Sequence, residues 1–242
     1  MNPMRVSASA RRVLRQLKHD PRSMALIIIA PCLLMTILKF VYWSQTQVFQ
    51  HVAGSLLGVF PMLVMFLITS VATLRERTSG TLERILISPI TKVEFIFGYA
   101  IAFGIASAVQ AIIVTTYAIG PLGLNIQGSQ GALVGVAILD ALLGLALGLF
   151  VSSFAKTEFQ AIQFLPVVLL PQLLLSGLLA PRESMPKILE VISNFLPLSY
   201  AVDATKKTLS GAGSIAIDVM IIIIFLAVLL GAGSLTLRRR TK

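Results

Sequence analysis

The sequence predicts an all-α integral membrane protein with six transmembrane helices. Hydrophobic residues make up 56% of the 242 residues, charged residues only 12%, and the mean hydropathy is +0.89. Soluble domains are roughly half apolar and a quarter charged. Apolar runs of about 20 residues, the length that a bilayer-spanning helix needs, follow one another with short polar joints. The chain therefore has no room for a sizeable soluble domain.

The apolar runs place all six spans in one transmembrane domain over residues 1–242. The expected spans are 24–43, 52–74, 95–119, 131–153, 160–180 and 215–237. The polar segments between and before them are 1–22, 75–94 and 184–209, and a basic tail ends the chain at 242. The uncharged joint 120–131 is dense in turn-forming residues and separates the third span from the fourth. The single cysteine, Cys32, excludes an intrachain disulfide.

The distribution of Lys and Arg predicts the orientation of the chain. With an even number of spans, both termini lie on one side, and all but five of the 20 Lys and Arg residues fall on that side. The exceptions are Lys39, Arg182, Lys187, Lys206 and Lys207. Short loops rich in these residues stay in the cytoplasm, so the termini and segment 75–94 are predicted to be cytoplasmic in a plasma (inner) membrane. The net charge of +10 follows this topology, and no motif indicates a nucleic-acid partner.

A basic segment, 1–22, precedes the first span. On a helix, one face of this segment carries only apolar side chains, and Asp20-Pro21 ends the pattern. Such a helix is expected to lie along the inner membrane surface. Because the apolar stripe is short, a merely solvated basic tail is the alternative. The stripe consists of Val6, Ala10, Val13, Leu14 and Leu17.

The polar segment 75–94 predicts a short, capped helix between two spans. Gly80 is a candidate N-cap with Glu83 at the third helical position, and Pro89 ends the helix. Thr91 and Glu94 then form a capping box that starts the third span. The pattern suits a helix that fills a groove on a partner protein, although an ordinary inner loop whose charges only enforce topology explains it equally well. The apolar ridge of this helix consists of Leu82, Ile85 and Leu86.

Prolines mark the outer part of the chain. Pro166 and Pro171 fall inside the fifth span, where each removes a backbone hydrogen bond and permits a kink. Residues 184–196 then place apolar side chains on one helical face, which predicts an amphipathic helix that dips into the outer leaflet. A second short helix is expected to follow, with Asp203 and Lys207 spaced four apart as an ion pair.

Two stretches of the sequence resemble a known family. They are "LRERTSGTLERILISPITKVEFIFGY" at 74–99 and, after two spans, "LLLSGLLAPRESMPKILEVISNFLPLSYAVDATKKTL" at 173–209. Together they resemble the membrane subunit of type-2 ABC exporters, with the closest similarity to permeases of the daunorubicin-resistance type. The resemblance covers essentially the whole chain.

The resemblance implies that residues 75–89 hold a coupling helix, which docks on a separate cytoplasmic ABC ATPase subunit. ATP and Mg would bind to that partner, because this chain has no G-x-x-x-x-G-K-[ST] phosphate loop and carries no cofactor of its own. The expected ATPase-coupling residues are Arg75, Glu76, Arg77, Gly80, Thr81, Leu82, Glu83, Arg84, Ser88 and Pro89.

The resemblance also implies an assembly and an outer corner. Two permease copies, most simply a homodimer, would form the pathway with two ATPase subunits. Re-entrant outer helices would correspond to 184–209. The sequence departs from the family pattern at Leu196, where an Asn is common. The corner that follows matches at Pro197, Leu198, Ser199 and Tyr200.

Polar and adaptable side chains inside the spans are candidates for a substrate pathway. Asp140 is the one carboxylate at mid-span, so it is either functional or a protonated or hydrogen-bonded structural group. A lone carboxylate, with His19 and His51 outside the spans and no metal-binding cluster, argues against an intramembrane enzyme. The weak pathway candidates are Phe60, Met62, Met65, Phe66, Asp140, Phe164, Gln172 and Ser176.

These observations lead to one functional prediction and two alternatives. The prediction is a transporter subunit that lies in the lipid bilayer and exports a small amphipathic drug-like or lipid-like compound out of the cell by alternating access. A polysaccharide or glycolipid exporter is an alternative within the same family. A membrane scaffold that recruits an ATPase without transport is the other, because its coupling helix would look alike.

Overall fold

The computed structural model describes residues 2–79 and 91–236, and these residues are almost entirely helical. The first helices are α1 (Pro3–Lys18), α2 (Pro21–Val41), α3 (Thr46–Thr78), α5 (Lys92–Ile119), α6 (Gln130–Ser152) and α7 (Glu158–Leu175). The chain continues through a short 3₁₀ helix, η1 (Arg182–Ser184), and then α8 (Lys187–Asn194), α9 (Pro197–Ser210) and α10 (Ala216–Thr236). The all-α prediction is confirmed.

Six of these helices are long and apolar enough to cross a membrane, as predicted: α2, α3, α5, α6, α7 and α10. Two boundaries differ from the prediction by five residues or more. Helix α3 begins at Thr46 rather than at residue 52, because Phe49 and Ala53 are buried against neighbouring helices and extend the regular packing outward. Helix α7 ends at Leu175 rather than at residue 180, because the chain turns at Gly177 with a φ of +82°.

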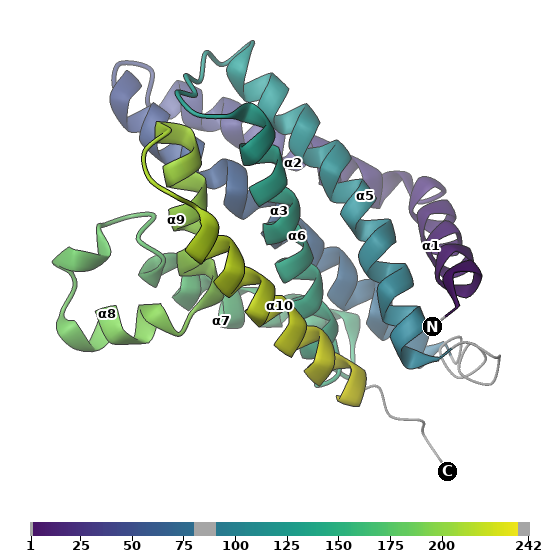
Figure 1. Ribbon diagram of the computed structural model, residues 1–242. Helices are drawn as coiled ribbons and strands as arrows, with labels where there is room; N and C mark the ends of the chain where they lie inside the picture. The colour runs from purple at the N-terminus through teal and green to yellow at the C-terminus, as the bar shows by residue number, and fades with distance from the viewer. Residues whose placement is uncertain (1, 80–90, 237–242) are drawn as a thin grey trace.

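Helices α3 and α6 form the centre of the bundle and run side by side in the same direction (Figure 1). Gly144 and Gly148 of α6 face the backbone of α3. A Cβ atom at these glycines would lie 2.2 Å from the Met62 carbonyl oxygen and 2.6 Å from that of Phe66. The two backbones are therefore in direct contact, which is the close packing expected of a small-xxx-small spacing in membrane helices.

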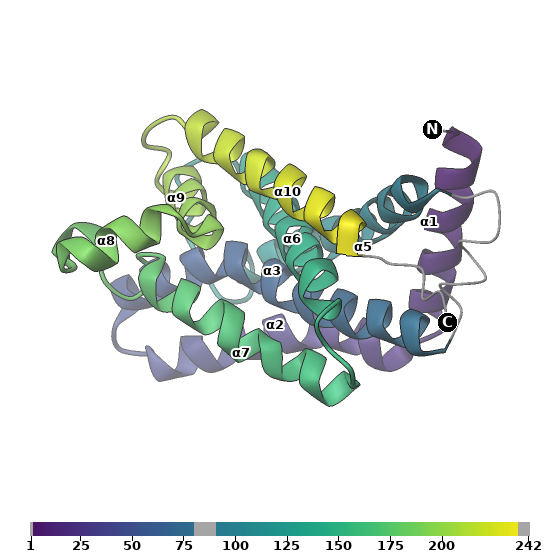
Figure 2. The ribbon, with the colours of Figure 1, turned by 90° about the horizontal axis from the view of Figure 1, so that it is seen from below.

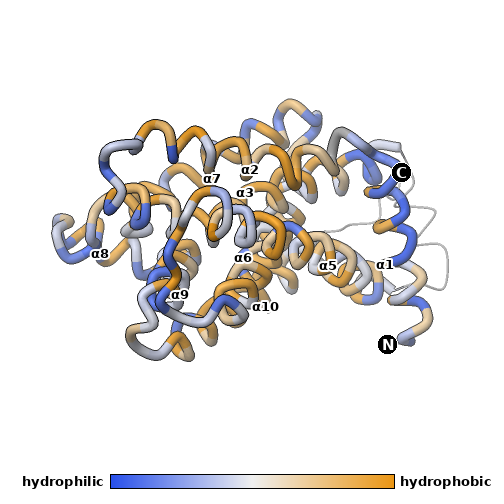
Figure 3. The backbone as a smooth tube through the Cα atoms, turned by 90° about the horizontal axis from the view of Figure 1, so that it is seen from above, coloured by the Kyte–Doolittle hydropathy of each residue, from blue (hydrophilic) through white to orange (hydrophobic). Residues whose placement is uncertain are grey.

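The other helices surround this central pair. Figure 2 shows α10 on one side of the pair and α2 and α7 on the opposite side. Helix α5 lies beside the pair and also contacts α1. Figure 3 shows that hydrophilic positions gather at the two ends of the bundle, around α1 and around α8 and α9, while the spans between them are hydrophobic. The outer face of the spans carries many exposed apolar side chains, as a lipid-facing surface requires.

Helix α1 confirms a helix in the basic N-terminal segment. It crosses the end of the bundle in Figures 2 and 3, and its apolar side chains are buried against α5, where Ser9 lies close to Gly98. The stripe is thus covered by protein, whereas Arg11 and Arg15 are exposed. The buried positions are Val6, Ala10, Val13 and Leu17. Contact of this helix with a membrane surface stays a prediction.

The outer segment differs from the prediction in two ways. The expected helix over 184–196 is shorter, because η1 ends at Ser184 and α8 starts only after Pro186. Asp203 and Lys207, four residues apart on α9, do not pair with each other. Each has an oppositely charged partner on another element, which is Arg182 for Asp203 and Asp218 for Lys207.

Candidate functional site

The predicted coupling residues divide between described and undescribed parts of the chain. Gly80, Thr81, Leu82, Glu83, Arg84, Ser88 and Pro89 lie outside the described residues, as does the predicted N-cap with its ridge. Both flanks of this segment are described. On its far side the predicted capping box is present, since Glu94 N donates to Thr91 Oγ1 at 3.2 Å and Thr91 N donates to Glu94 Oε2 at 2.9 Å.

On the near side, three consecutive residues of α3 reach three different helices. Arg75 binds Glu158 of α7 through two nearly parallel hydrogen bonds of 2.7 and 3.0 Å, a bidentate geometry that is the strong form of this pair. Glu76 pairs with Arg12 of α1 at 2.8 Å. Arg77 donates to the carbonyl oxygen of Ser152 at the end of α6. The end of α3 is therefore tied to α1, α6 and α7 at once.

The start of α5 is tied to α1 as well. The Asn2 backbone N–H donates to Glu94 Oε1 at 2.7 Å, and Arg5 lies 4.0 Å from Glu94 Oε2. Helix α1 consequently contacts both flanks of segment 80–90, through Glu76 on one side and Glu94 on the other. Sequence reasoning missed these partners, because no local pattern signals an ion pair between residues so far apart in the chain.

The pathway candidates from α3 lie in the packed interior of this chain. Met62, Met65 and Phe66 are fully buried. Met62 and Phe66 share a cluster with Phe164 of α7 and with residues of α6 and α9, whereas Met65 packs toward α5. Phe60 belongs to a third cluster nearer the outer loops. A role for these residues in a pathway stays a prediction.

Two more pathway candidates, Gln172 and Ser176, lie at the outer end of α7. Gln172 is buried and donates from Nε2 to the Val168 carbonyl oxygen, while its Oε1 has no hydrogen-bond partner among the described residues. Ser176, the C-cap of α7, is also buried; its hydroxyl donates to the Leu173 carbonyl oxygen and accepts from the Leu178 N–H.

Asp140 is fully buried where α3, α6 and α9 meet. Neither carboxyl oxygen has a hydrogen-bond partner among the described residues, and the same is true of the Thr205 hydroxyl. A Cβ atom at Gly58 would lie 3.0 Å from Asp140 Oδ2 and 2.2 Å from Thr205 Oγ1, so the absence of a side chain at Gly58 makes room for both. A buried carboxyl without partners is costly, which keeps both predicted roles for Asp140 open.

The outer corner lies at the start of α9. Pro197 occupies the first turn and Leu196 is the N-cap, where its side chain makes no capping hydrogen bond. The departure from the family pattern thus leaves that cap unfilled. Leu198 and Ser199 are fully buried, and the Tyr200 hydroxyl donates to the Asn194 carbonyl oxygen at 2.8 Å.

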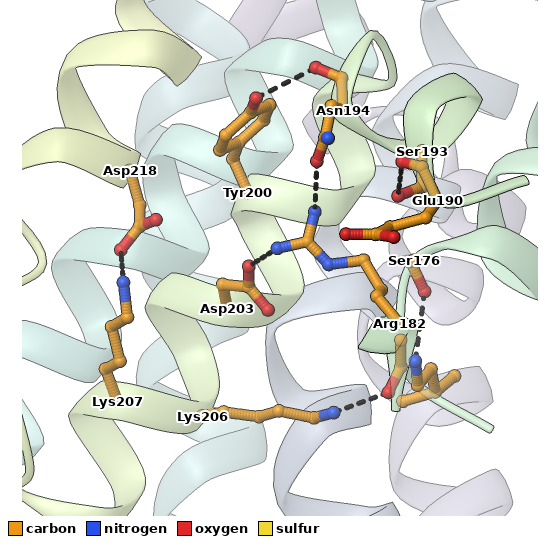
Figure 4. A network of polar contacts seen from close by, with 12 residues as sticks. Ser176, Arg182, Glu190, Ser193, Asn194, Tyr200, Asp203, Lys206, Lys207 and Asp218 are labelled. Atoms are coloured by element: carbon orange, nitrogen blue, oxygen red, sulfur yellow. Dashed lines mark hydrogen bonds and ion pairs between the residues drawn. The ribbon is translucent and has the colours of Figure 1, made fainter. Parts of the chain in front are cut away.

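A polar network surrounds this corner (Figure 4). Arg182 pairs with Asp203 and also donates to Asn194 Oδ1 at 3.3 Å, and Lys206 donates to the Gly177 carbonyl oxygen. Burial raises the pKa of the Asp203 carboxyl despite the nearby Arg182 guanidinium, and burial lowers the pKa of Lys206. The network fixes η1 and the end of α7 onto α9.

Comparison with known proteins identifies the family. The family model described as ABC-2 type transporter matches residues 4–210. The chain belongs to this family. The family assignment agrees with the six membrane-crossing helices, and relatives in the family are permease subunits of ABC transporters rather than enzymes.

The curated relatives are named as permeases, and some of these names refer to drugs or antibiotic resistance. "Probable multidrug ABC transporter permease YbhR" of Escherichia coli is 31% identical over 156 residues, which cover 64% of this chain and 42% of that protein. "Inner membrane transport permease YhhJ" of Escherichia coli is 32% identical over 165 residues, or 66% of this chain and 44% of that protein. "Linearmycin resistance permease protein LnrN" of Bacillus subtilis is 24% identical over 169 residues, or 68% and 43%. The chain spans less than half of the length of each of these relatives.

Proposed function

We propose that this chain is the transmembrane subunit of an ATP-driven exporter, which moves a small amphipathic drug-like or lipid-like compound out of the cell. A separate cytoplasmic ABC ATPase subunit binds ATP and Mg and docks on residues 75–89. The observation that carries this proposal is the set of contacts at the two flanks of segment 80–90. The names of the relatives, which include a multidrug permease and an antibiotic-resistance permease, support the substrate class.

The flanking contacts suit a mechanical connection. A displacement of the segment by a docked ATPase would pull on the end of α3 and on the start of α5. Arg75, Glu76 and Arg77 would pass that displacement to α7, α1 and α6, because each makes a direct polar contact with one of these helices. Packed helices joined by such networks move as rigid units, so a local push becomes a movement of whole spans.

The surface of α7 supports the proposed pairing of two permease copies. Gln163, Pro166 and Pro171 are exposed on this helix, whose exposed surface is otherwise largely apolar. An amide, and the backbone carbonyls that lose their hydrogen bonds at the two prolines, are poorly suited to lipid. A second copy that covers α7 would remove these groups from lipid, in a two-plus-two complex with cytoplasmic termini.

Affinity purification of the tagged chain from native membranes in mild detergent, with mass spectrometry of the co-eluting proteins, tests the proposal. We expect stoichiometric recovery of an ABC ATPase. The double variant Leu82→Arg and Glu83→Lys should abolish this recovery, because it removes an apolar contact and reverses a charge.

A matched control makes the same two kinds of change at the other end of the bundle. Ile188→Arg with Glu190→Lys alters α8, where Ile188 is 74% exposed, and should leave ATPase recovery unchanged. If no ATPase co-elutes, or if both double variants retain it equally, the coupling assignment is wrong. Stimulation of the recovered ATPase by a transported compound separates an exporter from a scaffold, since a scaffold shows none.

A further inference from the structure

A pocket of about 710 Å³ opens at the end of the bundle where α1 joins α2. Helices α3, α5 and α7 form its remaining walls. Figure 2 shows that two of the helices that line it, α2 and α7, lie on the side of α3 away from α10. Its volume lies in the range of sites for drug-sized ligands. Its walls are mainly apolar and include Leu26, Leu67, Ile68, Val71, Phe103 and Ile162. We call this site the inner pocket.

The rim of the inner pocket is acidic. It is lined by Asp20, Glu76 and Glu158. These are three of the ten acidic residues in a chain whose net charge is +10. Arg75 is the one arginine or lysine among the described lining residues, and it is bound to Glu158. Arg12, which is outside the lining, pairs with Glu76. Three carboxylates against these two arginines still give the pocket a charge opposite to that of the basic residues around it.

Glu76 is the deepest of these carboxylates. It is only 7% exposed, pairs with Arg12 at 2.8 Å, and lies next to the Tyr99 side chain. The rings of Tyr99 and Phe103, whose centroids are 5.7 Å apart, also line the pocket. A carboxylate beside aromatic rings is the chemistry that proteins use to hold organic cations.

We propose that the inner pocket binds an amphipathic cation, such as an organic ammonium or phosphonium ion. Glu76 and Glu158 attract its positive centre, and the apolar side chains of α2, α3 and α7 cover its hydrophobic body. This inference rests on the proposed function, in which such a cation is loaded here for export. Charge complementarity selects this occupant, because an anionic compound of the same shape would meet the acidic rim.

Equilibrium binding to the purified full-length chain in lipid nanodiscs tests the inference without an ATPase. The probes are radiolabelled tetraphenylphosphonium and tetraphenylborate, which share one shape and carry opposite charges. We expect saturable binding of the cation alone. Glu158→Gln and Glu76→Gln should each weaken it by roughly tenfold, the effect of about 1.4 kcal/mol.

Two further variants test whether a loss of cation binding comes from the shape of the pocket or from a general loss of carboxylate charge. Ala72→Phe fills part of the inner pocket without changing its charge and should also weaken cation binding. Glu190→Gln removes one carboxylate from the exposed helix α8 and should leave binding unchanged. Because Glu158 and Ala72 are accessible at the pocket, their substitution leaves the buried Arg12–Glu76 pair intact.

Equal binding of the two probes overturns the inference, and so does cation binding that none of the three pocket variants weakens. If ATPase recovery from membranes is intact, either result contradicts only the cation site and leaves the proposed function standing. Loss of ATPase recovery with normal cation binding would instead contradict the proposed function and leave the site standing.

Discussion

Arg12 of α1 and Glu76 of α3 form an ion pair in which Nη1 and Oε1 are 2.8 Å apart. Glu76 is buried beneath α1, and Tyr99 of α5 lies next to both partners. With Tyr99, the pair therefore joins three helices at the end of the bundle, at the start of the segment that the family resemblance assigns to ATPase docking. Its loss would separate α1 from the end of α3.

Arg12→Glu should destabilise the folded chain. Breaking a buried ion pair leaves an uncompensated charge, which costs roughly 3–5 kcal/mol when both partners are fully buried. The Arg12 side chain is 31% exposed, so we expect a smaller loss of about 2 kcal/mol. Thermal unfolding in detergent measures it. Adding Glu76→Arg should restore most of the stability by reversing the pair. If the double variant is no more stable than the single variants, the pair contributes little.

Gly144→Ala should force α3 and α6 apart. The new Cβ would lie 2.2 Å from the Met62 carbonyl oxygen, and backbone atoms do not yield easily. We expect a loss of about 1–3 kcal/mol, the usual cost of an overpacked core. Gly135→Ala on the same helix is the matched control, because its Cβ would meet no atom within 4 Å. Equal melting temperatures for the two variants would contradict direct backbone contact between α3 and α6.

Asp140→Asn should leave the stability of the chain unchanged or higher. The carboxyl has no hydrogen-bond partner among the described residues, and an uncharged amide avoids the cost of burying a charge. Unfolding midpoints of the variant and of Thr205→Val, which removes the neighbouring unpaired hydroxyl, measure this effect. A lower midpoint for Asp140→Asn would show that the carboxyl makes stabilising contacts. Lost export with intact stability would identify Asp140 as functional.

Arg182→Ala should loosen the outer segment. The substitution removes the partner of the half-buried Asp203 and the donor to Asn194, at a cost of about 1–3 kcal/mol. Hydrogen exchange should accelerate over residues 176–196 while α6 stays protected. Lys187→Ala is the control, because its pair with Glu190 is 81% exposed on the lysine side and such pairs contribute little. Equal exchange rates in both variants would show that the Arg182 contacts do not hold this corner in place.

Local patterns were sufficient to predict part of this structure. The six spans follow from runs of apolar residues, and the capping box of Thr91 and Glu94 follows from two residues three positions apart. Both signals depend on neighbours within one or two helical turns. The same reasoning failed for Asp203 and Lys207, where the spacing of four suggested a pair on one helix. Partners on η1 and α10 bind these side chains instead.

The sequence alone determined that this chain is a six-span helical membrane protein, because hydropathy and helix length act along the chain. Tertiary structure decided which charges meet. Arg75 and Glu158 are 83 residues apart, and Arg12 reaches Glu76 only because α1 folds back across the ends of α3 and α5. The inner pocket likewise exists only where five helices converge. Electrostatic and packing energies depend on distances in space, which a linear pattern does not contain.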